Sequence, residues 1–201
     1  MITIRLATPE DAAAMLAVYA PYVRETVITF EYEVPTLPEF RRRVEETLPR
    51  FPWLLAQDDA GSVLGYAYAS PYHSRAAYQW GAEGSIYLCP EAQGTGLAAP
   101  LYRCLLKLVA LQGIRSFYGC ITHPNPASEA FHRKLGFREL AIFPQAGYKQ
   151  GRWLDVLWCC LPLGAKEDAP APLCPFASLA PGQVAGILAE ANRETNTHRI
   201  L

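Results

Sequence analysis

The sequence predicts a mixed α/β protein in which helices cover both faces of one sheet. Segments of alternating or β-branched residues, typical of strands, are interleaved with segments whose apolar residues recur at helical spacing. Along the chain their order is strand, two helices, three strands, helix, strand, helix and two strands. Of the 201 residues, 51% are hydrophobic and 18% are charged, so the chain has enough apolar material for a core.

The N-terminal third begins with a strand in which Ile2, Ile4 and Leu6 alternate with polar residues. Thr8-Pro9-Glu10-Asp11 then predicts the start of a helix, because threonine can cap and proline suits the first helical position. Residues 26–34 are β-branched and aromatic, which indicates a loop or a short strand. Thr36-Leu-Pro-Glu39 opens a second helix.

Residues 53–57 and 62–69 are predicted strands, and Asp58-Asp-Ala-Gly61 between them is a hairpin signal. A loop over residues 70–79 follows. Further on, residues 115–121 form another predicted strand. Asn125 and Pro126 open a helix that ends at Gly136, and residues 137–143 and 153–161 are the last strands.

The composition changes after Pro162. Residues 164–175 are rich in alanine and proline and show little periodicity, which is typical of a linker. Residues 181–193 carry apolar residues at the spacing of a short helix. We therefore expect a main domain over residues 1–162, followed by an Ala/Pro-rich linker and C-terminal extension over residues 163–201.

Several classes of protein are disfavoured by composition. The net charge is -1, whereas proteins held on nucleic acid by charge usually carry a basic excess. No apolar run is long enough to span a membrane, and the N-terminus lacks the pattern of a signal peptide, so we expect a cytoplasmic protein. The six cysteines include no C-x-x-C pair; we expect no metal site and no disulfide framework.

The most informative stretch runs from Glu83 to Leu106 and is predicted to form a strand, a glycine turn and a helix. Gly94 and Gly96 allow a turn with no Cβ in the way. A helix that follows such a turn presents unpaired N–H groups and the positive end of its dipole. This arrangement predicts an anion site, most usefully one for phosphate.

Two nucleotide motifs fit this turn poorly. Gly94-Thr-Gly-Leu-Ala-Ala99 matches the loose dinucleotide fingerprint G-x-G-x-x-A, which expects an acidic residue roughly 20 residues further on. The chain has no aspartate or glutamate between Glu91 and Glu129. The Walker pattern is also absent, since no Gly-Lys-Ser/Thr follows the turn.

A third motif includes the preceding glutamine. Gln93-Gly-Thr-Gly-Leu-Ala98 resembles the pyrophosphate loop Q/R-x-x-G-x-G/A of the GNAT acetyltransferases, and Asn125–Phe137 resembles the family's second signature. Further segments resemble the phosphinothricin N-acetyltransferase branch, and the resemblance covers about residues 1–162. These segments are residues 4–11, 51–54, 78–83, 101–107, 111–113 and 146–156.

The resemblance implies the GNAT fold, with a mixed, mostly antiparallel sheet, and acetyl-CoA as co-substrate without a metal. It also implies a homodimer. By this resemblance the cofactor would be held by one strand, by the glycine turn with the start of its helix, and by one helix cap. The strand Ile86–Leu88 would be splayed from its neighbour. The residues implied are Ile86, Tyr87, Leu88, Gln93, Gly94, Thr95, Gly96, Leu97, Ala98, Ala99 and Asn125.

Acetyl transfer to an amine needs a base, a stabilised carbonyl oxygen and a donor for the leaving thiolate. Glu83, at the start of the strand before the glycine turn, matches the branch's proposed catalytic glutamate. His132 stands where many GNAT proteins carry a tyrosine that donates to sulfur. The alternatives are a solvated acid at a strand end and a histidine on a helix surface.

For the acceptor the candidates are Phe30, Arg75 and Tyr78, with Trp80 beside them; Arg75 would hold a carboxylate or phosphinate. The branch implies a small amino acid-like amine, of the phosphinothricin or methionine sulfoximine type. The sequence departs from the branch at His73, Gln150 and Leu154, on the acceptor side. The alternatives are another amine, such as a polyamine or a protein N-terminus, or a non-catalytic acyl-CoA-binding sensor.

Overall fold

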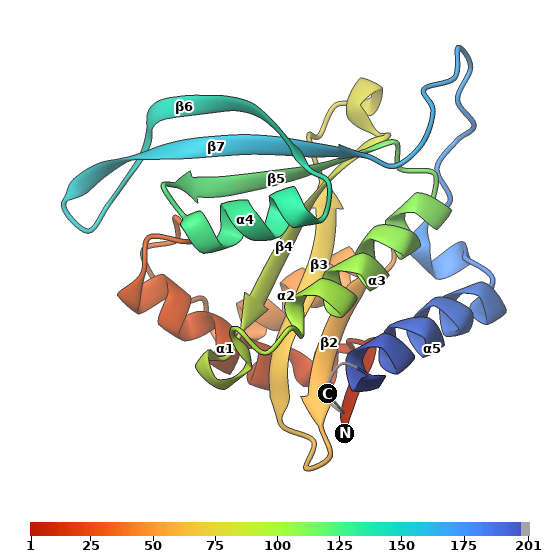
Figure 1. The fold of residues 1–201 in the computed structure, drawn as a ribbon, viewed down its shortest axis with the longest axis horizontal. Helices are drawn as coiled ribbons and strands as arrows, with labels where there is room; N and C mark the ends of the chain where they lie inside the picture. Colours follow the sequence, from red (N-terminus) through yellow and green to blue (C-terminus); the bar gives the residue numbers. More distant parts are fainter. Residues whose placement is uncertain (198–201) are drawn as a thin grey trace.

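The computed structural model describes residues 1–197 and confirms the predicted order of elements (Figure 1). Seven strands form one sheet in the order β1-β2-β3-β4-β5-β7-β6. Every neighbouring pair is antiparallel except β4 and β5, which are parallel. The strands are β1 (Ile2–Leu6), β2 (Trp53–Asp58), β3 (Val63–Pro71), β4 (Gly81–Leu88), β5 (Ser116–His123), β6 (Arg138–Lys149) and β7 (Arg152–Pro162). The helices are α1 (Ala12–Glu25), α2 (Leu37–Thr47), α3 (Ala98–Leu111), α4 (Pro126–Lys134) and α5 (Pro181–Thr197).

Helices cover both faces of the sheet, as predicted. Alternate side chains of a strand point to opposite faces, and β2 shows the division. Trp53 and Leu55 pack with residues of α1 and α2, whereas Leu54 and Ala56 belong to a second core cluster with residues of α3 and α5. Figure 1 shows α3 and α5 on the near side of β2 and β3, with α1 and α2 beyond them.

The sheet is divided between β4 and β5. Their parallel pairing joins Gly81–Glu83 to Ser116–Tyr118 and goes no further. Beyond Glu83 the two strands separate, so that residues 84–88 and 119–123 face a gap. The predicted splay of Ile86–Leu88 from the neighbouring strand is thereby confirmed.

The segment after β7 returns to the core. Residues 163–175 run past the end of the sheet, and α5 then packs beside α3 and β1 (Figure 1). Phe176, Val184 and Ala191 are buried in the same cluster as the α3 leucines. The predicted short helix is therefore present and extends to Thr197, while the division at residue 162 stays a prediction.

Two asparagines of α5 hold the edge of the sheet. Asn192 lies within hydrogen-bond distance of both backbone groups of Ile4, accepting from its N–H at 2.6 Å and donating to its carbonyl at 2.9 Å. Asn196 does the same at Ile2, at 3.0 and 2.9 Å. The two asparagines are four residues apart and so lie on one face of α5, and the two isoleucines are two residues apart and so present their backbone groups at one edge of β1. The helix spacing therefore matches the strand spacing. Unpaired groups of the edge strand β1 are thereby satisfied.

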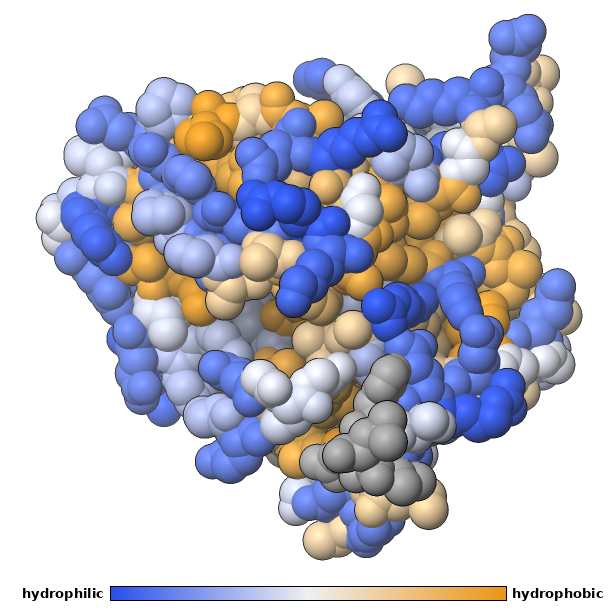
Figure 2. Space-filling view, in the orientation of Figure 1, coloured by the Kyte–Doolittle hydropathy of each residue, from blue (hydrophilic) through white to orange (hydrophobic). Residues whose placement is uncertain are grey.

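The hairpin of β6 and β7 extends beyond the rest of the sheet (Figure 1) and leaves large apolar side chains in solvent. Both strands are longer than the sequence predicted. Figure 2 shows hydrophobic residues at the surface over β6. The exposed residues are Leu140, Ile142, Phe143, Tyr148 and Trp153. Among residues 1–197, no helix has the length and apolarity to cross a bilayer.

Candidate active site

A cavity of about 70 Å³ occupies the gap between β4 and β5. Strand β4 lines one side of this gap, β5 the other, and the start of α4 closes it. Backbone groups that would bond to a neighbouring strand in a continuous sheet face this space instead. The cavity brings together predicted site residues that are distant in sequence: Ile86, Tyr87, Asn125 and His132.

Glu83 stands where the two strands part. It is the last residue of β4 that pairs with β5, its partner being Tyr118, and it also pairs with Ser70 of β3. The side chain is half-buried and makes no hydrogen bond or ion pair within the described chain. Burial raises the pKa of this carboxyl above its ordinary value of 4.5. A carboxyl with a raised pKa and no fixed partner is suited to take a proton from an amine.

His132 lies on the opposite face of the sheet and is 6% exposed, so it is not a surface histidine. Its ring packs edge-on against Tyr102, Phe131 and Phe137. Nδ1 donates to the carbonyl of Ser128 at 2.8 Å, which leaves Nε2 of the neutral ring as an acceptor. Burial lowers the pKa of His132 below 6.5, so the neutral form prevails at pH 7.

The approach of His132 to β5 depends on a glycine. A Cβ at Gly119 would lie 3.2 Å from Nε2 of His132 and 2.9 Å from Sγ of Cys159. A larger residue at this position would press the ring away from the gap. The absence of a side chain at Gly119 therefore sets the depth at which the imidazole sits.

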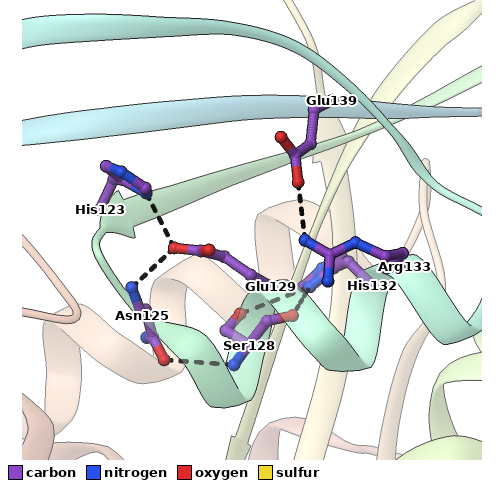
Figure 3. Close-up of polar contacts among 7 residues, drawn as sticks. All are labelled: His123, Asn125, Ser128, Glu129, His132, Arg133 and Glu139. Atoms are coloured by element: carbon purple, nitrogen blue, oxygen red, sulfur yellow. Dashed lines mark hydrogen bonds and ion pairs between the residues drawn. The ribbon is translucent and has the colours of Figure 1, made fainter.

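The turn between β5 and α4 is tied by a carboxylate (Figure 3). Glu129 accepts from the N–H of Asn125 at 2.7 Å and faces Nδ1 of His123 at 2.8 Å. These contacts, the Asn125 N–H first, lower the pKa of Glu129. Asn125 caps α4 as predicted, because Oδ1 accepts from the N–H of Ser128 at 3.2 Å. Its Nδ2 makes no hydrogen bond within residues 1–197.

The glycine turn has the conformation that the sequence predicts. Gly94 and Gly96 have φ of 72° and 87°, in the left-handed region that favours glycine. Helix α3 begins at Ala98 with no side-chain cap and no acidic residue in its first turn. The N–H groups of residues 94–97 make no hydrogen bond within the described chain, so they remain available to an anion.

Substitution of Gly96 by alanine should weaken acetyl-CoA binding by about tenfold or more, since a left-handed alanine is strained by roughly 1–2 kcal/mol and the turn would shift. Titration calorimetry with acetyl-CoA measures this change. Gly61→Ala is the matched control, because its φ is 82° but it lies in the β2–β3 hairpin. Equal loss of affinity in both variants would refute a specific role for the turn.

Gln93 lies at the turn but contacts protein groups. Its Nε2 donates to the hydroxyl of Tyr22 at 3.0 Å, and that hydroxyl donates to the carbonyl of Leu88 at 2.6 Å. The N–H of Leu88 also points at Tyr22, at 3.3 Å. The backbone groups of Leu88 are therefore engaged by α1. Gln93 ties the glycine turn to α1 and to the end of β4.

Phe30 lies on the loop between α1 and α2, against the β6–β7 hairpin. The ring fills the space beside Gly147, where no Cβ could be placed without a clash. Lys149 of the same hairpin is buried and donates from Nζ to the carbonyl of Thr29 at 2.7 Å. The hydroxyl of Tyr32 donates to the carbonyl of Tyr148. The hairpin thus fixes the loop that carries Phe30.

The other acceptor candidates lie beyond Glu83, toward the start of β4. Tyr78 is 43% exposed and stacks edge-on with Tyr72, while Arg75 is exposed and precedes a short 3₁₀ turn. Trp80 contacts the extension, because its Nε1 donates to the carbonyl of Ala171 at 3.0 Å. Phe30 therefore lies against the β6–β7 hairpin, whereas Arg75 and Tyr78 lie in the segment before β4.

Several residues of the site were not identified from the sequence. Tyr22 and Tyr118 stand at positions where the sequence pattern predicts ordinary core residues. Nothing in their spacing predicts the hydrogen bonds of the Tyr22 hydroxyl or the pairing of Tyr118 with Glu83. Lys149 lies in the segment 146–156 that resembles the phosphinothricin branch, which was the available signal. Glu129 had a weaker one, since an acidic residue in the first helical turn often contacts unpaired N–H groups.

A split sheet, a glycine turn before a helix and a partly buried carboxylate at the fork define a class of acyl-transfer site. The family model "Acetyltransferase (GNAT) domain" matches residues 4–158. The chain belongs to the GNAT acetyltransferase family.

Named relatives and a solved structure agree with this family. Over 175 residues the chain is 35% identical to a phosphinothricin N-acetyltransferase of Streptomyces coelicolor, with 81% of this chain and 96% of the relative covered. It is 34% identical over 170 residues to an L-methionine sulfoximine/L-methionine sulfone acetyltransferase of Pseudomonas aeruginosa, covering 84% and 98%. A phosphinothricin acetyltransferase of Sinorhizobium meliloti, solved with AcCoA, has a TM-score of 0.81 and 33% identity, covering 87% and 98%.

Proposed function

We propose that the protein transfers acetyl from acetyl-CoA to the primary amine of a small amino acid-like acceptor, of the phosphinothricin or methionine sulfoximine type. The observation that carries this proposal is the position of Glu83 at the fork of β4 and β5. An unpaired carboxyl with a raised pKa stands there, beside the gap that His132 and Asn125 line.

The reaction begins with the acceptor ammonium. Glu83, directly or through a water, takes one proton, and the freed nitrogen lone pair attacks the thioester carbon. The C–N bond forms and the C–S bond breaks. Neutral His132 has its acceptor Nε2 at the gap, so it takes the second nitrogen proton and passes it to the departing sulfur. Amide, free thiol and one released proton complete the balance.

Acetyl-CoA would be held along β4 and at the start of α3. The free N–H groups of residues 94–97, with those of Ala98 and Ala99, would bind the pyrophosphate, helped by the dipole of a 14-residue helix. Thr95 is turned inward, since its hydroxyl donates to the carbonyl of Ala92 at 2.7 Å. Ile86 and Tyr87 would offer backbone groups to the pantetheine, and Asn125 its Nδ2. Gln93 would act by fixing the turn.

Lys149→Met should raise the KM for the amine by about tenfold, while the affinity for acetyl-CoA stays unchanged. The charged hydrogen bond to Thr29 is lost, and bonds of this kind contribute roughly 1.5–3 kcal/mol. The loop carrying Phe30 would then no longer be fixed over the acceptor. Steady-state kinetics with both substrates varied gives the two constants. The matched control is the exposed Lys134→Met on α4, and an unchanged amine KM in Lys149→Met would refute the role of the loop.

A panel of amines tests the proposed function. Release of free CoA should be fastest with methionine sulfoximine or phosphinothricin and slow with polyamines. The second candidate is a different amine, favoured by the acidic pair Glu31 and Glu33 beside Phe30; Glu31, however, is neutralised by Arg43 at 2.5 Å. Preference for a polyamine would establish that alternative. Tight acetyl-CoA binding without turnover of any amine would indicate a sensor.

We infer that the exposed apolar hairpin takes part in a homodimer, while a cytoplasmic location stays the expectation from the sequence. Large apolar side chains exposed along one hairpin, here Leu140, Ile142, Phe143 and Trp153, are typical of a surface that another protein chain covers. Sedimentation analysis should give twice the mass of the 22.2 kDa chain, and Trp153→Glu should shift it to the monomer. With its net charge of -1, the chain is not expected to bind nucleic acid or a membrane surface.

A further inference from the structure

The segment between β7 and α5 closes a second cavity, of about 260 Å³, at the start of β4. We call it the extension cavity. Its lining includes three tyrosines, one arginine and two residues of the extension: Tyr72, Tyr78, Tyr118, Arg115, Lys166 and Glu167. The family model ends at residue 158, so one wall of this cavity is built by residues outside it.

The wall is held at three points. The N–H of Leu163 donates to the carbonyl of Arg115 at 3.0 Å, and Trp80 Nε1 donates to Ala171 at 3.0 Å. The N–H of Cys174 donates to the carbonyl of Gln112 at 2.9 Å. Residues 163–174 are thus attached at three points, and Figure 1 shows the segment after β7 rising into a loop before it runs down to α5.

The polar groups of the cavity are suited to a carboxylate. Nε of Arg115 is buried and has no hydrogen-bond partner. Nη2 lies 3.9 Å from Oε1 of Glu167, beyond hydrogen-bond distance. Lys166 makes no ion pair within residues 1–197. A carboxylate can bind the Nη groups of an arginine through charge-assisted hydrogen bonds, and two cations, Arg115 and Lys166, line this cavity with one carboxylate, Glu167.

The extension cavity adjoins the proposed site of amine attack. Tyr118 pairs with Glu83 in the sheet and stacks on Tyr72 with ring centroids 4.0 Å apart. Arg115 lies three residues before Tyr118, a distance of roughly 10 Å along a strand. An extended peptide spans about 3.3–3.6 Å per residue. Because Tyr118 and Arg115 line the same cavity, an amine at Glu83 and a carboxylate at Arg115 are within the reach of one short peptide.

We propose that the extension cavity is a carboxylate subsite that takes the C-terminus of a short peptide whose free N-terminus lies at Glu83. The inference rests on the proposed amine acetylation and extends it to acceptors longer than one amino acid. Arg115 binds the carboxylate, Lys166 adds a second positive charge, and the rings of Tyr72 and Tyr78 flank the peptide. Glu167 competes with the peptide carboxylate for the Arg115 guanidinium.

Calorimetric titration of the CoA-loaded protein with trialanine and with trialanine amide tests the subsite, because the two peptides differ only in the terminal carboxylate. The acid should bind at least about tenfold more tightly than the amide. Arg115→Gln should abolish that difference and Lys166→Gln should reduce it. Glu167→Gln should tighten binding of the acid. Lys166 and Glu167 belong to an extended surface segment, so we expect their variants to fold. Their affinities for the two peptides therefore test the subsite even if Arg115→Gln folds poorly.

Equal affinity for acid and amide in the unmodified protein would overturn the subsite. The subsite would also be overturned if the protein acetylated methionine sulfoximine but showed no preference for trialanine over trialanine amide. That result would leave the proposed function intact. Preferential binding of the acid without acetylation of any amine would support the subsite and overturn the proposed function. The two hypotheses can therefore fail separately.

Discussion

Glu83→Gln should lower kcat by roughly 10²–10⁴-fold, the usual contribution of a general base. The amide has nearly the shape of the carboxyl but cannot take the ammonium proton. Affinity for acetyl-CoA should stay within about twofold, because the side chain points to the α1 and α2 face while the glycine turn lies beyond the other end of β4. Single-turnover kinetics and calorimetry measure the two effects separately.

The pH dependence of the reaction rate is a second test of Glu83. Burial raises the pKa of Glu83 above 4.5, so the rate should rise with pH through that raised value, and this rise should be absent in Glu83→Gln. The folded protein holds this proton to higher pH than the unfolded chain. The contribution of Glu83 to the free energy of unfolding should therefore fall as pH rises from about 4.5 through the raised pKa, and the difference between the parent and Glu83→Gln isolates it.

Two comparisons decide whether this assignment stands. Glu46→Gln, an exposed substitution on α2, is the control and should change neither rate nor pH profile. An unchanged kcat in Glu83→Gln would rule out the base. A reduced kcat with an unaltered pH profile would instead indicate that Glu83 only positions the acceptor.

The double substitution Asn192→Ala/Asn196→Ala should lower the free energy of unfolding by about 2–6 kcal/mol. Four hydrogen bonds to the backbone of Ile2 and Ile4 are lost, and each contributes roughly 0.5–1.5 kcal/mol. The freed edge of β1 would also be open to pairing with another chain. Urea denaturation monitored by tryptophan fluorescence gives the first quantity, and light scattering detects association.

The control for this pair lies on the same helix. Glu190→Gln removes a surface ion pair with Lys107 and leaves both asparagines in place, so stability should not change measurably. If the double alanine variant were as stable as the parent, hydrogen bonds from water would satisfy the backbone groups of Ile2 and Ile4 equally well. The edge-holding role of α5 would then be wrong.

The order and type of the elements followed from local patterns. Alternation in Ile2, Ile4 and Leu6 predicted β1, and the proline and glycine positions predicted where α3 begins and where α4 begins and ends. Such signals are local because capping, positive φ and side-chain alternation each depend on a few neighbouring residues. The lengths of β6 and β7 were underestimated, since exposed apolar residues in a projecting hairpin do not follow the usual alternation of a half-buried strand.

The sequence by itself determined the glycine turn, the cap at Asn125 and, through resemblance, the family, and it predicted Glu83 and His132 as the catalytic pair. Tertiary structure alone decided the rest. It placed Glu83 and His132 on opposite faces of a split sheet, set the tautomer of His132 through Ser128, and joined Lys149 to Thr29 across 120 positions of the chain. It also brought the extension over Arg115. These contacts depend on which distant segments pack together, and a local pattern carries no record of that.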